Sequence, residues 1–370
     1  MIFCENCFND KEIISIICSV PLLNTGKCPL CHNEGHLYNT DTQNFLTPYF
    51  EELLNIYAPS TTLPETYPRA KVRSLIDDLK DRWNIFAEIP REQIYEILKS
   101  ICGELYANVP ELFNGAVGIP ELYDSVYLRE HALLEHALLK NNNWDAFVEE
   151  IKTKNRFHSK LINFDILEKY CSFIRKPYKK GKLFYRARIS DRSGYPKSEM
   201  SAPPAGKSLE GRANARGIVC LYVASDVDTT LHEVRAGVFD FVSVGTFQLK
   251  KDITVVDLRA IAEISPFVEG LDYLDHAINK QYLEKLNIEM SKSLRRSDST
   301  LDYVPTQYIV DFIKSITHNG KQEYDGIEYN STTNPGGYNL SIFNPDVFEC
   351  MAVDVYDIEQ LHYTFTRVNR

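Results

Sequence analysis

Two closely spaced pairs of cysteines near the start of the chain constrain its fold more than any other feature. Cys4 and Cys7 form one Cys-x2-Cys pair, and Cys28 and Cys31 form the second. Each pair offers two sulfurs from one tight turn, which is the spacing of a tetrahedral four-thiolate zinc site. A closed shell of four sulfurs leaves no open position for catalysis, so we expect a structural Zn²⁺ in a zinc-binding module over residues 1–42.

The same segment carries further residues of the type that binds zinc. They are Cys18, His32 and His36, and either histidine could take the place of one cysteine in the tetrahedral set. The module has few apolar residues with which to offset the entropy of its chain, so we expect it to fold only with metal bound.

Length and charge limit the classes of protein to which the chain can belong. Its 370 residues are enough for two or three domains, and its formal net charge of -10 disfavours broad binding to nucleic acid or to an anionic membrane. No apolar run approaches the roughly 20 residues that cross a bilayer, and no export signal precedes the cysteine pairs. We therefore expect a cytoplasmic protein, in which clustered cysteines bind metal before they form disulfides.

Amphipathic periodicity predicts an all-α helical bundle over residues 43–178. Apolar side chains recur there at the helical period, and prolines fall between the helical stretches. The four clearest sets are Phe50, Leu53, Leu54 and Tyr57; Val72, Leu75, Ile76 and Leu79; Ile94, Ile97, Leu98 and Ile101; and Leu128, Ala132, Leu133 and Ala137.

Residues 179–370 have a different texture and predict an α+β domain. Short runs of β-favouring residues alternate with turns, and one longer stretch has helical character. The predicted strands are residues 183–188, 218–223, 242–249, 253–257, 326–330, 339–343 and 349–356, and the predicted helix is 303–316.

A candidate cleft is encoded in the middle of this domain. Gly211-Arg212-Ala213-Asn214 forms a small-residue loop, and Tyr222 lies near the end of the strand that follows. Asp226-Val227-Asp228 then supplies N-cap candidates for a helix that carries Glu233 about two turns from its start. This order of loop, strand and helix predicts that Glu233 points back towards the strand end that carries Tyr222.

Two other motifs do not qualify as sites. Residues 205–208 read Ala-Gly-Lys-Ser, but the first glycine of a phosphate-binding loop would stand at position 201, which is Ser201. Arg129 and His136 loosely resemble the arginine and histidine of helical-bundle ribonucleases. The competing interpretation, which we prefer, places them on the surface of a structural helix.

The C-terminal domain, over about residues 180–365, resembles the RES family, named for its arginine, glutamate and serine. Members of that family have a fold similar to ADP-ribosyltransferase toxins and degrade NAD. The region ahead, with Asn155-Arg156-Phe157, resembles the helical HEPN-like domain that precedes some RES domains. The resemblance rests on Tyr185-Arg186-Ala187-Arg188, Gly211-Arg212-Ala213-Asn214, Leu221-Tyr222, Glu233, Tyr329-Asn330-Ser331 and Asn334-Pro335-Gly336-Gly337.

The resemblance implies a role for each of these side chains. The Glu233 carboxylate would stabilise positive charge on the ribose in an oxocarbenium-like transition state. Guanidinium groups match phosphate oxygens, and a tyrosine can stack on nicotinamide. Each residue also has an ordinary interpretation: a salt bridge, a core tyrosine or a turn serine. We expect Glu233, Arg212, Tyr222 and Ser331 to act in catalysis, and Arg186, Arg212, Tyr222, Ser331 and Asn214 to bind NAD.

The leading hypothesis is therefore an enzyme that cleaves the nicotinamide–ribose bond of NAD and acts as a toxin or anti-phage effector. Water or phosphate would accept the ribosyl group. Residues 1–178 would then bind an antitoxin or a trigger, or mediate self-association. Two alternatives remain open, namely ADP-ribosyl transfer to a protein or nucleic acid, and a non-catalytic nucleotide-binding zinc adaptor.

Overall fold

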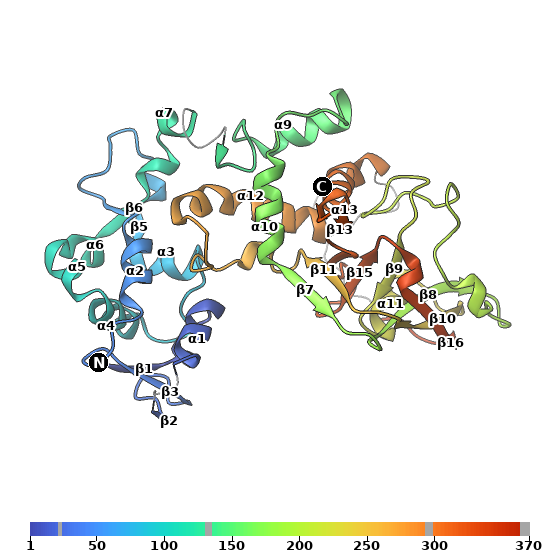
Figure 1. Cartoon of the computed structure of the whole chain (residues 1–370), viewed down its shortest axis with the longest axis horizontal. Helices are drawn as coiled ribbons and strands as arrows, with labels where there is room; N and C mark the ends of the chain where they lie inside the picture. The colour runs from blue at the N-terminus through green and yellow to red at the C-terminus, as the bar shows by residue number, and fades with distance from the viewer. Residues whose placement is uncertain (21–23, 130–134, 293–298, 363–370) are drawn as a thin grey trace. The chain divides into compact units, whose positions relative to one another are not determined.

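The computed structural model describes residues 1–20, 24–129, 135–292 and 299–362. The described chain divides into two compact units, and each unit combines two separate stretches of sequence (Figure 1). The N-terminal unit consists of Met1–Asn142 and Glu263–Gln281, and the C-terminal unit consists of Asn143–Ala262 and Tyr282–Arg370. None of the described helices is both long enough and apolar enough to span a membrane.

The cysteine segment and the helices of the N-terminal unit share a hydrophobic core. Phe3, Tyr38, Phe50, Leu79 and Ile97 are all fully buried in it. The unit's elements are β1 (Ile2–Cys4), η1 (Glu5–Cys7), α1 (Lys11–Cys18), β2 (Thr25–Lys27), β3 (Glu34–Asn39), α2 (Thr47–Leu54), β4 (Ala58–Pro59), η2 (Arg69–Lys71), β5 (Arg73–Ser74), α3 (Leu75–Asp81), α4 (Arg91–Ile101), α5 (Gly103–Asn108), α6 (Pro110–Asn114), β6 (Ala116–Gly118), η3 (Pro120–Leu122) and α7 (Ser125–Tyr127).

Residues 43–178 differ from the predicted all-α bundle in two ways. The short strands β4, β5 and β6 form an antiparallel sheet in the order β4-β6-β5, and strands of two or three residues leave no alternating pattern in the sequence. Residues 143–178 belong to the C-terminal unit, since α10 (Phe164–Phe173) contacts other elements there and β7 (Arg175–Tyr178) joins its main sheet. Ala132 and Leu133 of the last predicted helix lie outside the described residues.

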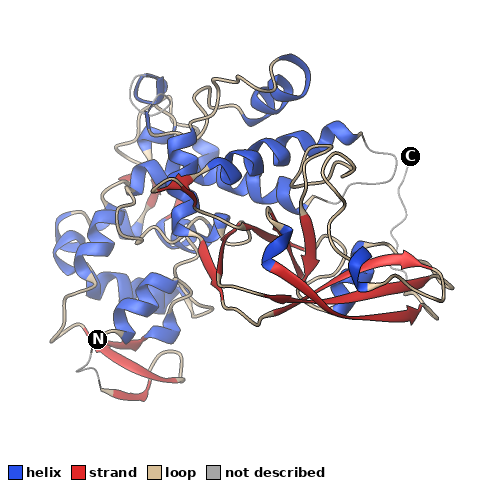
Figure 2. Cartoon of the chain, turned by 45° about the vertical axis from the view of Figure 1, so that its right-hand side comes forward, coloured by secondary structure: helices blue, strands red, loops and turns tan. Residues whose placement is uncertain are grey.

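A large mixed sheet organises the C-terminal unit (Figure 2). Its strand order is β16-β10-β8-β9-β15-β14-β11-β7, and the β11–β14 pair is parallel. The unit's other elements are α9 (Trp144–Glu149), η5 (Glu150–Lys154), β8 (Leu183–Ser190), η6 (Lys197–Glu199), β9 (Leu221–Ala224), α11 (Val227–Glu233), β10 (Phe241–Leu249), β11 (Ile253–Asp257), η8 (Thr300–Tyr303), α13 (Val304–Ser315), β12 (Thr317–His318), β13 (Lys321–Gln322), β14 (Gly326–Asn330), β15 (Tyr338–Ile342), η9 (Pro345–Val347) and β16 (Phe348–Asp357). Two further elements, η7 (Ile261–Glu263) and α12 (Tyr273–Ser291), each have residues in both units.

The strands match the β-favouring runs of the sequence closely. β14 and β11 have the predicted bounds, and the other predicted strands agree apart from one to three residues at an end. The run predicted from 218 begins at Leu221 instead, because Gly217 adopts a positive φ of 86° and Ile218 closes a turn onto Ala215. α12 starts in the N-terminal unit and ends in the C-terminal unit.

Candidate active site

Helix α11 positions Glu233 beside the central strands of the sheet. Asp226 caps the helix by accepting hydrogen bonds from the Thr229 backbone at 2.7 Å and the Thr229 hydroxyl at 2.8 Å. The Thr230 hydroxyl accepts a hydrogen bond from the Ala187 backbone of β8 at 2.9 Å, which ties the helix to the sheet. Glu233 is the last residue of α11, since Arg235 adopts a left-handed backbone with φ of 52° soon after it.

The turn between β14 and β15 packs against the start of the same helix. A Cβ atom on Gly337 would lie 2.2 Å from the Thr229 hydroxyl, so this close approach requires glycine. Asn334 donates to the Thr229 hydroxyl at 2.9 Å, and its backbone donates to the Ser331 hydroxyl at 3.1 Å. The Asn-Pro-Gly-Gly sequence thereby holds Ser331 within reach of the end of α11.

Polar side chains converge on one oxygen of Glu233. Ser331 donates to Glu233 Oε1 at 2.6 Å, Asn339 at 2.9 Å and Thr333 at 3.2 Å. Within the described residues, no protein group donates a hydrogen bond to Oε2. A carboxylate at the C-terminal end of a helix meets the unfavourable end of the helix dipole, and these neutral donors offset that cost.

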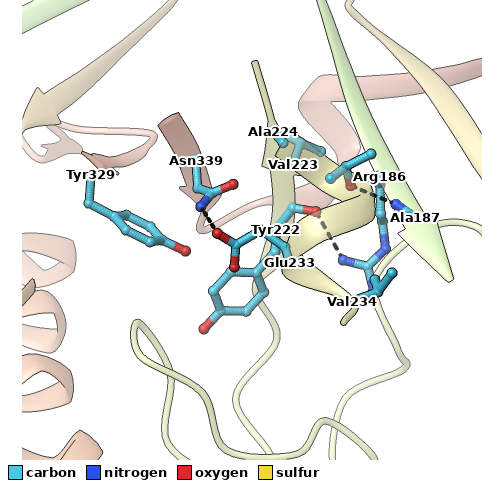
Figure 3. A pocket seen from close by; sticks show the side chains of 10 residues that line it. Arg186, Ala187, Tyr222, Val223, Ala224, Glu233, Val234, Tyr329 and Asn339 are labelled. Atoms are coloured by element: carbon cyan, nitrogen blue, oxygen red, sulfur yellow. Dashed lines mark hydrogen bonds between the residues drawn. The ribbon is translucent and has the colours of Figure 1, made fainter. Parts of the chain in front are cut away.

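A cavity of about 260 Å³ opens beside this carboxylate. Figure 3 shows Asn339 pointing at the Glu233 carboxylate and Arg186 reaching the backbone of Tyr222. The residues that line the cavity are Arg186, Ala187, Tyr222, Val223, Ala224, Thr230, Glu233, Val234, Tyr329 and Asn339.

Arg186 brings a partly unsatisfied cation to the cavity. Its Nη1 donates to the Tyr222 carbonyl at 3.0 Å, whereas its buried Nε has no hydrogen-bond partner among the described residues. Burial, with a smaller contribution from the nearby Arg188 cation, lowers the pKa of Arg186 to about 10. Arg186 is therefore still charged at neutral pH and is costly to leave buried without an anion.

Tyr222 lines the cavity with its ring and turns its hydroxyl away into the loop before the strand. The hydroxyl donates to Asn214 Oδ1 at 2.6 Å and accepts from the Ala213 backbone at 3.0 Å, and burial raises the pKa of Tyr222 well above its usual range. Asn214 is buried, and its amide nitrogen donates to the carbonyls of Leu209, Ala215 and Ile218. Asn214 is therefore occupied in holding the loop together.

Arg212 lies against α12 and is not among the residues that line the cavity. It donates to the carbonyl of Glu289 at 2.9 Å and to that of Lys292 at 2.6 Å. Its guanidinium carbon lies 5.8 Å from the centre of the Tyr329 ring, which does line the cavity. In this conformation Arg212 reaches the site only through Tyr329.

Sequence reasoning predicted Arg186, Tyr222, Glu233 and Ser331 as site residues, and they lie together in the structure. It gave no role to Asn339, Thr333 or Tyr329, although Tyr329 belongs to a motif quoted above. Asn339 and Thr333 bind Glu233 directly, and Tyr329 forms part of the cavity wall. Asn339 is a buried polar residue near the start of β15, between Tyr338 and Leu340. A buried amide there needs a partner, which was the available signal.

The four paired cysteines lie together at the other end of the chain, within the N-terminal unit. Their sulfurs are all within 4.8 Å of one another. Cys4 Sγ lies 3.5 Å from Cys31 Sγ, and Cys7 Sγ lies 3.7 Å from Cys28 Sγ. Each of these contacts joins one Cys-x2-Cys pair to the other, as the spacing predicted.

His136, considered above as a ribonuclease residue, has a partner that accounts for its position. Its Nδ1 lies 3.0 Å from an Asp275 carboxylate oxygen, and its carbonyl accepts from Asn279 at 2.8 Å. These contacts favour the structural interpretation of His136.

Comparison with known protein families matches the part of the chain that contains Glu233. The family model described as the RES domain matches residues 183–366, which contain every residue of the cavity. No curated protein and no solved structure matches the chain. RES domains are associated with NAD-related toxin functions. The match supports assigning residues 183–366 to the RES family.

Proposed function

We propose that residues 183–366 form an enzyme that cleaves the bond between nicotinamide and ribose in NAD. The observation that carries the proposal is the Glu233 carboxylate, held through Oε1 by Ser331 and Asn339 beside a cavity that also contains Arg186. Three donors fix the orientation of the carboxylate and leave Oε2 for a ligand. A preorganised anion beside a buried cation suits a substrate that is positive at one end and anionic at the other.

The chemistry follows from the charges that develop during cleavage. As the bond from ribose C1 to the nicotinamide nitrogen breaks, its electron pair moves to the nicotinamide ring and positive charge develops on the ribose. The Glu233 carboxylate would stabilise that charge and orient the ribose hydroxyls. Addition of water then yields ADP-ribose, nicotinamide and a proton. Addition of phosphate instead yields ADP-ribose carrying a phosphate on C1.

The arginines would serve the pyrophosphate. Arg186 is the better-supported candidate, because it lines the cavity and its Nε has a hydrogen to donate. Arg212 would act as a positioning residue through Tyr329, or bind phosphate after leaving the carbonyls at the end of α12. The Tyr222 ring would stack on the nicotinamide.

We further propose that Cys4, Cys7, Cys28 and Cys31 hold a structural Zn²⁺. Sulfurs at 2.3 Å from a tetrahedral zinc ion lie about 3.8 Å apart, and the observed separations of 3.5 and 3.7 Å fit that arrangement. The ion would then stabilise the N-terminal unit. Residues 1–178 would bind an antitoxin or trigger, or mediate self-association, for a toxin or anti-phage effector in the cytoplasm.

Purified full-length protein incubated with NAD, with and without phosphate, tests the enzymatic proposal. We expect nicotinamide release, and a loss of on the order of 10²-fold or more in Glu233→Gln. The glutamine oxygen can still accept from Ser331 and Asn339, so the variant should fold normally. Glu349→Gln, an exposed glutamate on β16, is the matched control and should release nicotinamide at the wild-type rate.

The products distinguish the competing functions. Free ADP-ribose identifies hydrolysis, its phosphate ester identifies phosphorolysis, and label retained on a macromolecule identifies ADP-ribosyl transfer. Wild-type activity in Glu233→Gln would remove Glu233 from the mechanism. NAD binding without nicotinamide release from any of the proteins would instead favour the nucleotide-binding adaptor.

A further inference from the structure

Another cluster of metal-binding side chains lies in the N-terminal unit beside the four cysteines. Glu5, Cys18 and His36 each offer one ligand atom, and these atoms all lie within 4.8 Å of one another. The three residues come from separate segments, since Glu5 lies in η1, Cys18 ends α1 and His36 lies in β3. Three different donor types gathered from three elements require an explanation beyond local sequence.

The Cys18 thiol and the Glu5 carboxylate contact the same ring nitrogen of His36. Cys18 Sγ lies 3.7 Å from His36 Nδ1, and Glu5 Oε1 lies 3.1 Å from the same atom. Ligands bound at 2.0–2.3 Å in a tetrahedral zinc site lie about 3.3–3.8 Å from each other. Both separations are therefore close to those of ligands that share one zinc ion.

This geometry does not suit a thiol nucleophile activated by a histidine. In such a relay the thiol contacts one ring nitrogen, and the orienting carboxylate contacts the other. Here both groups meet at Nδ1. An ion pair between Glu5 and His36 would explain the carboxylate alone but gives no reason for the thiol to approach the same nitrogen, whereas a cation at the point of convergence accounts for all three.

The carboxylate is fixed in place before any ligand binds. Glu5 Oε2 accepts a hydrogen bond from the His36 backbone at 2.7 Å, and Asn6 donates to the Glu34 carbonyl at 3.0 Å. A Cβ atom on Gly35 would lie 2.7 Å from Glu5 Oε2, so the residue before His36 allows this contact by having no side chain. Holding a ligand in position lowers the entropy lost on binding.

We propose that Glu5, Cys18 and His36 bind a second divalent cation, separate from the four-cysteine site and of the Zn²⁺ class. Sulfur, imidazole and carboxylate donors together suit zinc. They do not suit magnesium or calcium, because those ions prefer oxygen ligands alone. Three protein ligands leave a fourth position for water. Cys18 is exposed and the His36 side chain is 36% exposed, so this ion exchanges with solvent faster than one enclosed by four thiolates.

Zinc content per chain tests the proposal in the full-length protein. We expect about two zinc ions per wild-type chain after loading with zinc and removal of the excess, and about one in Cys18→Ser and in His36→Asn. His32→Asn is the matched control, because His32 is exposed and has a φ of 61°, which asparagine tolerates. It should keep about two ions.

The unfolding midpoint identifies which site each substitution affects. Cys18→Ser and His36→Asn should lose one ion and keep nearly the wild-type unfolding midpoint, with the ion that remains resistant to a chromogenic chelator. A single zinc ion in the wild-type chain, lost in Cys7→Ser, would overturn the proposal. Loss of all zinc together with unfolding in His36→Asn would also overturn it, because His36 would then belong to the structural site.

Discussion

The cysteine cluster and the Glu233 cavity are both built from a few polar side chains, but the chain assembles them over different distances. The sulfur contacts join residues 27 and 21 positions apart. The hydrogen bonds of Ser331 and Asn339 to Glu233 join residues 98 and 106 positions apart. One region is thus specified by a local pattern, and the other exists only once the whole sheet has formed.

The two regions should also respond differently to the loss of one group. Four thiolates around one ion act together, because removing a ligand opens the shell and releases the ion on which the local fold depends. The donors around Glu233 are neutral and separate, so each can be removed while the others remain. Substitutions should therefore have all-or-none effects in the first region and graded effects in the second.

The largest expected effect is that of Cys7→Ser. The variant should lose its structural zinc and with it metal-coupled folding free energy on the order of 10 kcal/mol, so that the N-terminal unit no longer unfolds cooperatively. The C-terminal unit has its own core and should keep its own calorimetric transition. Zinc content and differential scanning calorimetry measure both effects.

Cys102→Ala provides the comparison for that experiment. Cys102 is a buried cysteine of the same unit that lies outside the metal cluster, so its loss leaves only a small cavity. It should keep its zinc and lower stability by about 1 kcal/mol. Equal damage from the two substitutions would show that packing, and not metal, accounts for the effect at Cys7.

Graded loss is expected for Ser331→Ala and Asn339→Ala. Each removes one hydrogen bond to Glu233 Oε1, worth about 1 kcal/mol, so kcat/KM for nicotinamide release should fall about 5- to 10-fold. The double variant should lose less than the product, because both bonds orient the same oxygen. Steady-state kinetics on all three variants measure this coupling.

Ser172→Ala removes an exposed hydroxyl from α10, remote in sequence from the cavity, and should leave kcat/KM unchanged. If Ser331→Ala also left kcat/KM unchanged, the hydrogen bond from Ser331 to Glu233 would have a structural role only.

The sequence predicted much of the sheet because its strands are short, β-favouring and bounded by turns. β14 was predicted with its observed bounds. The sequence pattern did not reveal how the chain divides into two units. Helix α12 starts in one unit and ends in the other, and no composition shift marks the change. The boundary expected at residue 178 falls at the end of β7, which pairs with β11 in the main sheet.

The candidate site was likewise predicted in part. Glu233 and Ser331 came from motifs recognised in order along the chain, whereas Asn339 depends on a contact that no local pattern records. Arg212 illustrates the converse limit, since a cation expected at a phosphate site donates to backbone carbonyls at the end of α12. Local sequence patterns identify candidate residues, but the orientation of their side chains depends on the tertiary structure.

Acid should distinguish the two units as well. Burial, helped by the nearby Lys280 cation, lowers the pKa of His276 in the N-terminal unit to about 3. The folded state therefore favours neutral His276. The contribution of this group to the free energy of unfolding is fully present above pH 6.5 and is lost as the pH falls towards 3. Between pH 6.5 and 5.5 the loss should be about 1 kcal/mol.

His276→Gln should reduce that dependence, since glutamine keeps a donor for the Ile264 carbonyl, 3.1 Å from His276 Nε2, and does not titrate. Denaturant unfolding at a series of pH values measures it. His318→Gln changes an exposed histidine and should retain the wild-type slope. An identical slope in His276→Gln would mean that other groups take up the protons.

We expect the smallest effect for Tyr222→Phe. This variant separates a structural role of the Tyr222 hydroxyl from a catalytic one. The hydroxyl binds Asn214 and the Ala213 backbone, so its loss should cost about 1 kcal/mol of stability by leaving those partners unsatisfied. The ring stays in place, so nicotinamide release should change less than about threefold. Tyr222→Leu, which removes the aromatic face, should raise KM for NAD further than Tyr222→Phe does. A large fall in kcat for Tyr222→Phe with unchanged stability would instead mean that the hydroxyl leaves Asn214 during catalysis and contacts the substrate.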